Sequence, residues 1–237
     1  MRSGRASVKK RALTRDEIVR AAEHILEKDG YEGLTIRNVA ARLGVKSASL
    51  YWHFATKEEL EDALADELLA RVSADYVESG DWKENIRQGS LHMMRRLLSI
   101  RDSSRLLAGR FLTGPNALRW MERCLKPFLE AGLGKREVAY ASHAIHVYIQ
   151  GFVIFRSAPL SAMESKGSSK AKVLGATRKK FQGLSPITFP NIVALADALT
   201  EADIEARFLF GLDCLIAGLA QRAGAKAAHD SSLVSKR

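Results

Sequence analysis

The sequence has little cysteine, no long hydrophobic run and no strand pattern, and each shortage excludes a class of protein. Its 237 residues include only 2 cysteines, Cys124 and Cys214, which lie far apart in the chain. They are too few for a disulfide framework or a cysteine zinc motif, and a reducing cytoplasm suits them. No run of about 18 apolar residues predicts a membrane span, and no apolar segment follows the basic first residues as in a signal peptide. We therefore expect a cytoplasmic protein that does not cross a membrane.

Apolar and polar residues do not alternate over any stretch long enough for a β-strand, and no internal repeat occurs. Apolar residues recur instead at helical spacing. The segments Thr14-Arg-Asp-Glu17 and Thr56-Lys-Glu-Glu59 both fit the capping-box pattern at the start of a helix. The sequence predicts an all-α fold, with an N-terminal three-helix domain at residues 12–60 and a larger helical domain at residues 61–222.

Positive charge is concentrated in three segments. The net charge is +10, yet residues 1–11 and 159–186 each carry +5 and residues 222–237 carry +3, which leaves −3 for the rest of the chain. We predict that residues 1–11 form a basic flexible arm, which either grips a polyanion or is simply solvated. Residues 159–186 are rich in Ser, Gly and Lys, so we predict a mobile loop there, and a flexible tail at 223–237.

Two short helices are predicted around the turn Gly44-Val45-Lys46, with the dimensions of a helix-turn-helix. Thr35 can cap the first helix, and Ser47 opens the second. Leu50 and Phe54 share a face of the second helix at i, i+4, so we expect both to be buried. The residues expected to face outward are Ser47, Ala48, Ser49, Tyr51, Trp52 and His53. Small residues at a helix start permit close approach to base edges, and exposed aromatic residues suit a surface that a partner covers.

Residues 34–54 and the following Thr56-Lys-Glu-Glu-Leu60 resemble the DNA-binding domain of the tetracycline-repressor (TetR) family. The resemblance implies a bacterial homodimeric transcription regulator whose two helix-turn-helix motifs lie about one helical turn apart on a near-palindromic operator. It also implies which residues touch DNA: Arg37, Ser47, Ala48, Ser49, Tyr51, Trp52, His53 and Lys57.

Each of these residues also has a plainer interpretation. Arg37 can be a solvated helix charge, while Tyr51 and Trp52 can pack on the motif itself. Lys57 occupies the first turn of its helix, an unfavourable place for a cation, which favours contact with a phosphate.

The second half of the chain resembles the regulatory domain of the same branch at Trp82, at Ser99-Ile-Arg-Asp102 and at Phe208-Leu-Phe-Gly-Leu212. This resemblance implies that helices at about 136–157 and 201–222 pair with their copies in a four-helix dimer bundle. Two long, apolar helices agree with that expectation. The alternative is an ordinary internal core.

Two departures from the tetracycline-responsive members concern the effector. The histidine that binds the drug-chelated metal falls at Leu107, and the acidic residue from the partner subunit falls at Phe155. Mg²⁺ needs oxygen ligands, which neither side chain offers. We therefore expect no metal and no cofactor, and an unidentified, largely apolar or aromatic small-molecule effector. The expected effector-binding residues are His92, Met93, Leu107, Arg110, Gln150 and Phe155, although the apolar ones can equally be plain core.

No nucleophile motif, glycine-rich phosphate loop or Cys/His cluster appears, so we expect no enzyme activity and no catalytic residue. His143 and His146 are spaced i, i+3 and can share a metal. A third ligand is missing, however, so we favour the interpretation that both are interface histidines with satisfied hydrogen bonds. The function predicted is a repressor that an effector releases from its operator, with residues 57–78 as the lever. The alternatives are a DNA-binding regulator or activator that needs no ligand, and a helical enzyme in which the motif is incidental.

Overall fold

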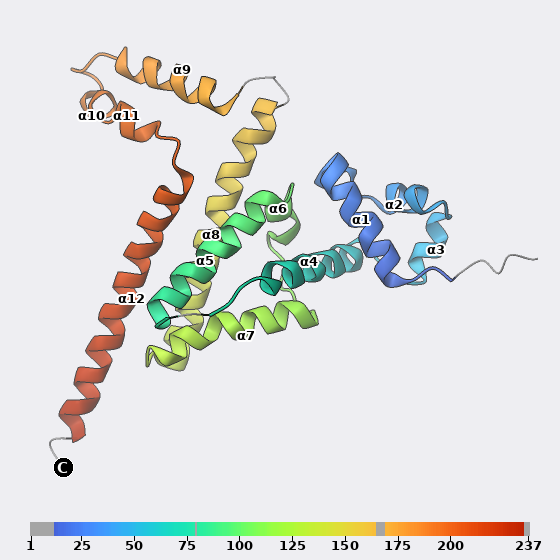
Figure 1. The fold of residues 1–237 in the computed structure, drawn as a ribbon, viewed down its shortest axis with the longest axis horizontal. Helices are drawn as coiled ribbons and strands as arrows, with labels where there is room; N and C mark the ends of the chain where they lie inside the picture. Colours follow the sequence, from blue (N-terminus) through green and yellow to red (C-terminus); the bar gives the residue numbers. More distant parts are fainter. Residues whose placement is uncertain (1–11, 79, 165–168, 235–237) are drawn as a thin grey trace, which may run out of the picture. The chain divides into compact units, whose positions relative to one another are not determined.

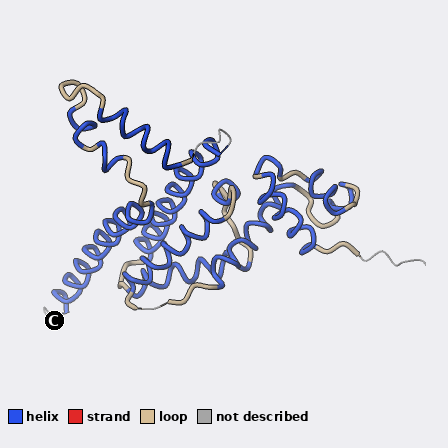
Figure 2. The backbone as a smooth tube through the Cα atoms, turned by 45° about the horizontal axis from the view of Figure 1, so that its top comes forward, coloured by secondary structure: helices blue, strands red, loops and turns tan. Residues whose placement is uncertain are grey.

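The computed structural model describes residues 12–78, 80–164 and 169–234 of the chain. Within these ranges all regular structure is helical, which confirms the predicted all-α fold (Figure 2). The elements are α1 Arg15–Asp29, η1 Tyr31–Gly33, α2 Ile36–Leu43, α3 Ser47–Tyr51, α4 Lys57–Ala74, α5 Trp82–Ser99, α6 Ser103–Leu107, α7 Pro115–Glu130, α8 Lys135–Glu164, α9 Lys170–Gln182, α10 Pro190–Ala194, α11 Ala196–Leu199 and α12 Ile204–Val234.

The chain divides into two compact units. The N-terminal unit comprises the described residues up to Arg71 together with Ile100–Leu118, and the C-terminal unit comprises Val72–Ser99 and the residues from Arg119 onward. The N-terminal unit therefore contains more than the predicted domain at 12–60, since the distant segment 100–118 joins it. The predicted boundary after residue 60 stays a prediction.

Local capping signals determine where the first helices begin and end. Thr14 and Glu17 form the predicted capping box of α1, with Glu17 N donating to Thr14 Oγ1 at 3.2 Å and Thr14 N to Glu17 Oε2 at 3.0 Å. Thr35 caps α2 by accepting a hydrogen bond from Asn38 N at 3.1 Å. Gly44 ends α2 with a φ of 66°, in the left-handed region that favours glycine.

Two carboxylates help to join the segment 100–118 to the rest of the N-terminal unit. Asp102 accepts a hydrogen bond from Tyr31 N at 2.9 Å. Asp66, in the middle of α4, accepts from Asn116 N at 3.0 Å and from Ala117 N at 2.8 Å. Because these two donors are free N–H groups of the first turn of α7, Asp66 acts as a cap that α4 supplies to another helix.

In the C-terminal unit, α5 packs along α8 and α12 (Figure 1). Val153 of α8 and Phe208 and Leu212 of α12 are fully buried in this core. Tyr148 of α8 donates a hydrogen bond to the carbonyl of Phe208 at 2.8 Å. This bond ties the two long helices together.

Two predictions about the basic segments are wrong. Residues 170–182, expected within a mobile loop at 159–186, form α9, which packs against α10 and α11. Residues 223–234, expected in a flexible tail at 223–237, continue α12 to Val234. Residues 170–182 are rich in Lys and residues 223–234 in Ala, both good helix formers, and the prediction gives too much weight to charge and to small polar residues. The predicted arm at 1–11 lies outside the described residues.

The segment Lys135–Arg156 of α8 is long and apolar enough to cross a membrane, judged by length and composition alone. This differs from the expectation that no segment of the sequence passes such a test. Length and composition are weak support for a membrane span, because core helices of soluble proteins pass the same test.

Candidate nucleic-acid interface and effector-binding residues

Helix α3 ends at Tyr51, so Trp52 and Phe54, expected within this helix, follow its end. As predicted, Leu50 and Phe54 are fully buried, while Tyr51 is 53% exposed and Trp52 is 90% exposed. The guanidinium of Arg15 in α1 lies 4.0 Å from the centre of the Phe54 ring and also donates to the carbonyl of His53. Helix α1 thus fixes the C-terminal end of α3, at which the aromatic residues Tyr51 and Trp52 are exposed.

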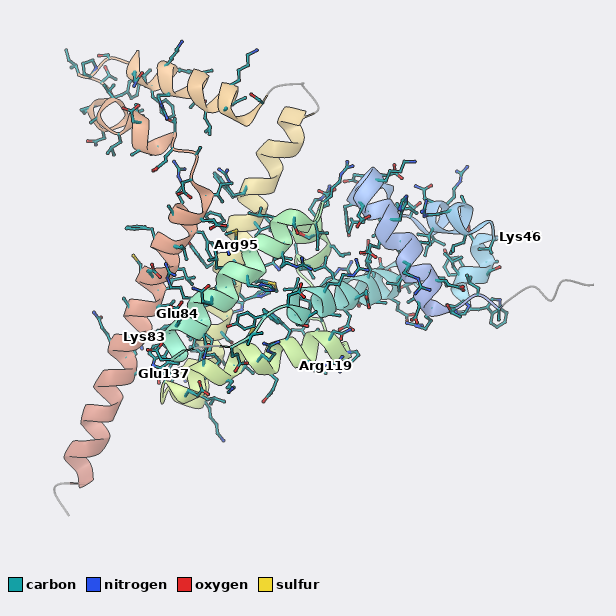
Figure 3. All side chains as sticks on the ribbon, in the orientation of Figure 1. Lys46, Lys83, Glu84, Arg95, Arg119 and Glu137 are labelled. Atoms are coloured by element: carbon teal, nitrogen blue, oxygen red, sulfur yellow. The ribbon has the colours of Figure 1, made fainter. Side chains whose placement is uncertain are left out.

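The turn before α3 is built by backbone bonds around Gly44. Val45 N donates to Ala40 O at 3.0 Å, and Ser49 N donates to Lys46 O at 2.9 Å, so α3 begins directly after the turn. Lys46 is exposed at the N-cap position of α3 (Figure 3). The sequence analysis does not single out Lys46, although a cation immediately before the outward helix is a usable signal.

The other residues expected to touch DNA are all accessible to solvent. Arg37 on α2 and Ala48 on α3 are exposed, while Ser47, Ser49 and His53 are partly exposed. The turn and α3 therefore present hydroxyl, aromatic and cationic groups on one short element.

Lys57 begins α4, whose start matches the second predicted capping box only in part, because the Glu59 side chain bonds the backbone N–H of Ala55 and not that of Thr56. Glu59 N donates to Thr56 Oγ1 at 3.1 Å, and Ala55 N donates to Glu59 Oε2 at 2.8 Å. The ammonium of Lys57 lies 3.0 Å from Glu61 Oε1 and 5.1 Å from the centre of the Tyr31 ring. Lys57 is thus partly exposed and is held by contacts within the N-terminal unit.

Two of the six expected effector-binding residues belong to the N-terminal unit. Leu107, at the end of α6, is buried. The guanidinium of Arg110 pairs with Glu61 and with Asp62, the latter at 2.5 Å. Burial alone would lower the pKa of Arg110, but Asp62, Tyr31 and Glu61 raise it. The sequence analysis does not find these ion pairs. Arg110 lies 48 positions after Asp62 and 49 positions after Glu61, and no local pattern links residues so far apart.

The remaining four residues belong to the C-terminal unit. Met93 is buried, and His92 Nε2 donates to Val72 O at 2.6 Å, which leaves Nδ1 for another partner. Gln150 is 9% exposed, and its Oε1 has no hydrogen-bond partner among the described residues. Phe155 is 77% exposed on α8.

Two further titratable side chains, His146 and Cys124, have shifted pKa values. No group of three or more His, Cys, Asp or Glu side chains within the described ranges is arranged to hold a metal ion. Desolvation and the neighbouring His143 lower the pKa of His146. Burial raises the pKa of the Cys124 thiol to about 12, which makes it a poor nucleophile.

Two family models match this chain. Residues 18–64 match the model of bacterial regulatory proteins of the tetR family, and residues 76–223 match the tetracyclin repressor-like C-terminal domain. The first match contains α2, α3 and the start of α4, and the second contains α5, α8 and most of α12.

Individual proteins agree with these matches. The chain is 33% identical over 214 residues to the class A tetracycline repressor protein from transposon 1721 of Escherichia coli, covering 89% of this chain and 92% of the repressor. It is also similar to the TetR family protein ActR of Streptomyces coelicolor in complex with actinorhodin, with a TM-score of 0.78, 31% identity and coverage of 90% and 99%. A tetracycline repressor variant of Acinetobacter baumannii in complex with minocycline has a TM-score of 0.66, 28% identity and coverage of 89% and 98%.

Proposed function

The chain belongs to the TetR family of DNA-binding transcription regulators, and from that premise we propose that it is a homodimeric, cytoplasmic repressor that a small-molecule effector releases from a near-palindromic operator. One observation carries the proposal: α3 presents Tyr51 and Trp52 outward while Leu50 and Phe54 anchor it. An indole with nine-tenths of its surface in water is costly unless a partner covers it.

The proposed DNA contacts come from α2, α3 and the start of α4. Ser47, Ala48 and Ser49 approach base edges at the start of α3, while the aromatic residues contact sugars, phosphates and thymine methyl groups. Lys57 neutralises a phosphate. The full set is Arg37, Ser47, Ala48, Ser49, Tyr51, Trp52, His53 and Lys57, to which we add Lys46.

A dimer is supported by the apolar side chains that α8 and α12 leave exposed. Val147, Ile154 and Phe155 of α8 and Phe210 of α12 are each more than two-fifths exposed. The same helices have a buried face within the C-terminal unit, so each helix is apolar on two sides. Pairing α8 and α12 with their copies in a four-helix bundle would remove this second face from water.

The proposal of a small-molecule effector rests on polar and apolar side chains of the chain rather than on a metal site. Gln150 offers a buried acceptor without a partner, which a ligand N–H or O–H can satisfy. His92, Met93 and Phe155, which belong to the same unit as Gln150, would supply further contacts. For Leu107 and Arg110, which belong to the N-terminal unit, a part in effector binding rests on the family resemblance alone. Binding of actinorhodin by ActR, and of minocycline by the Acinetobacter protein, supports a small molecule as the effector.

Release from DNA is a population shift between forms that differ in the spacing of their α3 helices. A ligand must prefer the released form by about 10⁴-fold to move a population from 1:99 to 99:1. Tight binding without such a preference would leave the operator occupied.

Replacement of Tyr51 tests the DNA surface. Tyr51→Ala and Lys57→Ala should weaken binding to the operator, identified by a genomic footprint, while the dimer stays intact in sedimentation. Phe189→Ala is the matched control, because Phe189 is an exposed aromatic residue of the C-terminal unit outside α8 and α12. Wild-type affinity in both DNA-face variants would contradict the placement.

Titration of the operator complex with a compound library separates the alternatives. A releasing compound supports the effector-controlled repressor, whereas an intact complex throughout favours a regulator or activator that needs no ligand. Turnover of a bound compound by a protein without operator preference would favour the helical enzyme.

A further inference from the structure

A buried carboxylate lies between two cations in the N-terminal unit. Glu61 of α4 is only 3% exposed in its side chain. Its Oε1 lies 3.0 Å from the ammonium of Lys57, and its Oε2 pairs with the guanidinium of Arg110. The two cations are unequal in exposure, since the Lys57 side chain is 38% exposed and that of Arg110 is 16% exposed.

Arg110 is held at this place by further contacts from α4. Its Nη1 donates to Asp62 Oδ1 at 2.5 Å and lies 3.4 Å from the carbonyl oxygen of Glu58. Arg110 itself belongs to the non-helical segment between α6 and α7. The segment therefore places a fixed positive charge on α4, one turn from the lysine that begins the helix.

Glu61 is the main group that holds the Lys57 ammonium in place. A cation in the first turn of a helix opposes the helix dipole, and a lysine four residues before a glutamate has the weaker of the two orientations for an ion pair. A buried carboxylate with a single cation nevertheless holds it strongly, because an unpaired buried charge is costly. With two cations present, either can leave while the other keeps the carboxylate neutralised.

We propose that Arg110 is a positioning residue for Lys57: by sharing the Glu61 carboxylate, it leaves the Lys57 ammonium free to turn toward a DNA phosphate. The inference rests on the proposed function, in which Lys57 contacts that phosphate. It gives the segment between α6 and α7 control over operator affinity without any contact of its own with DNA. Withdrawal of Arg110 would leave Lys57 as the cation that Glu61 retains.

A double-mutant cycle tests the coupling. Arg110→Ala should weaken operator binding about five- to tenfold and lower the slope of log K against log salt, by about 0.9 for each phosphate that is no longer neutralised. In a Lys57→Ala background, and in a Glu61→Gln background, Arg110→Ala should cause no further decrease in affinity. Arg110→Lys, which keeps the charge, should restore part of the affinity. Equal decreases in all backgrounds, or no decrease in wild type, would overturn the proposal.

The matched control is Arg71→Ala. Arg71 lies on the same helix α4, 14 residues from Lys57, or about 21 Å along the helix, and pairs with Glu23 of α1 and Glu67 of α4. Its replacement removes ion pairs of α4 without reaching Glu61, so operator affinity should stay within twofold of wild type. A decrease as large as that of Arg110→Ala would assign the effect to the fold of α4 and refute a specific role.

A measurement without DNA separates this inference from the proposed function. Acetylation of the Lys57 amine by acetic anhydride, followed by mass spectrometry, should be severalfold slower in Arg110→Ala than in wild type, because Glu61 then retains the ammonium. An unchanged rate would overturn the coupling. If Lys57→Ala binds the operator like wild type, the phosphate contact of Lys57 is refuted and the positioning role falls with it, while the acetylation rate still shows whether Arg110 acts on Lys57.

Discussion

Replacing Asp66 by alanine should detach the start of α7 from α4. Asp66 accepts hydrogen bonds from two backbone N–H groups of the first turn of α7 and, at 2.9 Å, from the side-chain amide of Asn116. In the alanine variant these three donors have no charged acceptor. Water can replace it only in part, because Asn116 is half-buried and Ala117 is buried.

The expected destabilisation follows from the kind of bonds removed. An N-cap contributes about 0.5–2 kcal/mol, and a hydrogen bond to a charged group about 1.5–3 kcal/mol. Since the three bonds share one carboxylate and are not additive, we expect the free energy of unfolding to fall by about 2–4 kcal/mol. For a chain of this length this lowers Tm by roughly 4–16 °C.

Thermal unfolding followed by circular dichroism measures this destabilisation. Asp66→Asn keeps one acceptor oxygen and should be destabilised about half as much. Asp75→Ala is the matched control, because the Asp75 carboxylate is 71% exposed and lies 3.8 Å from Arg96, an ion pair worth less than about 1 kcal/mol. The reasoning is refuted if Asp66→Ala melts within about 1 °C of wild type, a shift too small for a capping bond, or if Asp75→Ala is destabilised as much.

Three further predictions concern reactivity and binding. Burial raises the pKa of the Cys124 thiol to about 12, although the residue is partly exposed. In a Cys214→Ser variant at about pH 8, the folded protein should therefore react with Ellman's reagent much more slowly than the unfolded chain, and equal rates would contradict this. Deletion of residues 1–11 removes a charge of +5 and should lower both operator affinity and its salt slope, so an unaltered slope would show that the arm does not touch DNA. Mg²⁺–tetracycline should not release the operator, because Leu107 and Phe155 offer no oxygen ligand, and release at micromolar drug would refute the alignment.

The sequence predicted the elements whose signals are local. Thr14 with Glu17, and Thr56 with Glu59, mark helix starts within four residues; the first capping box is complete, and at the second Thr56 caps Glu59 N while Glu59 bonds Ala55 N. Leu50 and Phe54 share a face within a single turn, and both are buried. Such patterns need no knowledge of the rest of the chain.

The contacts that the sequence did not predict join residues about fifty positions apart. Asp66 and Asn116, or Glu61 and Arg110, have no spacing that marks them as partners before the fold is known. The error at α9 had another origin. The prediction of a mobile loop takes the lysines of this segment as a sign of mobility. Lysine is, however, a good helix former, and Phe181 of α9 is partly buried.

The shortness of α3 has a consequence for the evolution of target choice. Its five residues span about 7.5 Å, close to two base-pair steps of a duplex. A helix of that length has few outward side chains, so one substitution at Ala48 or Ser49 changes a large share of the groups that it can present to bases. If α3 contacts bases as proposed, descendants of this protein can acquire new target sites by single substitutions while the scaffold beneath α3 stays the same.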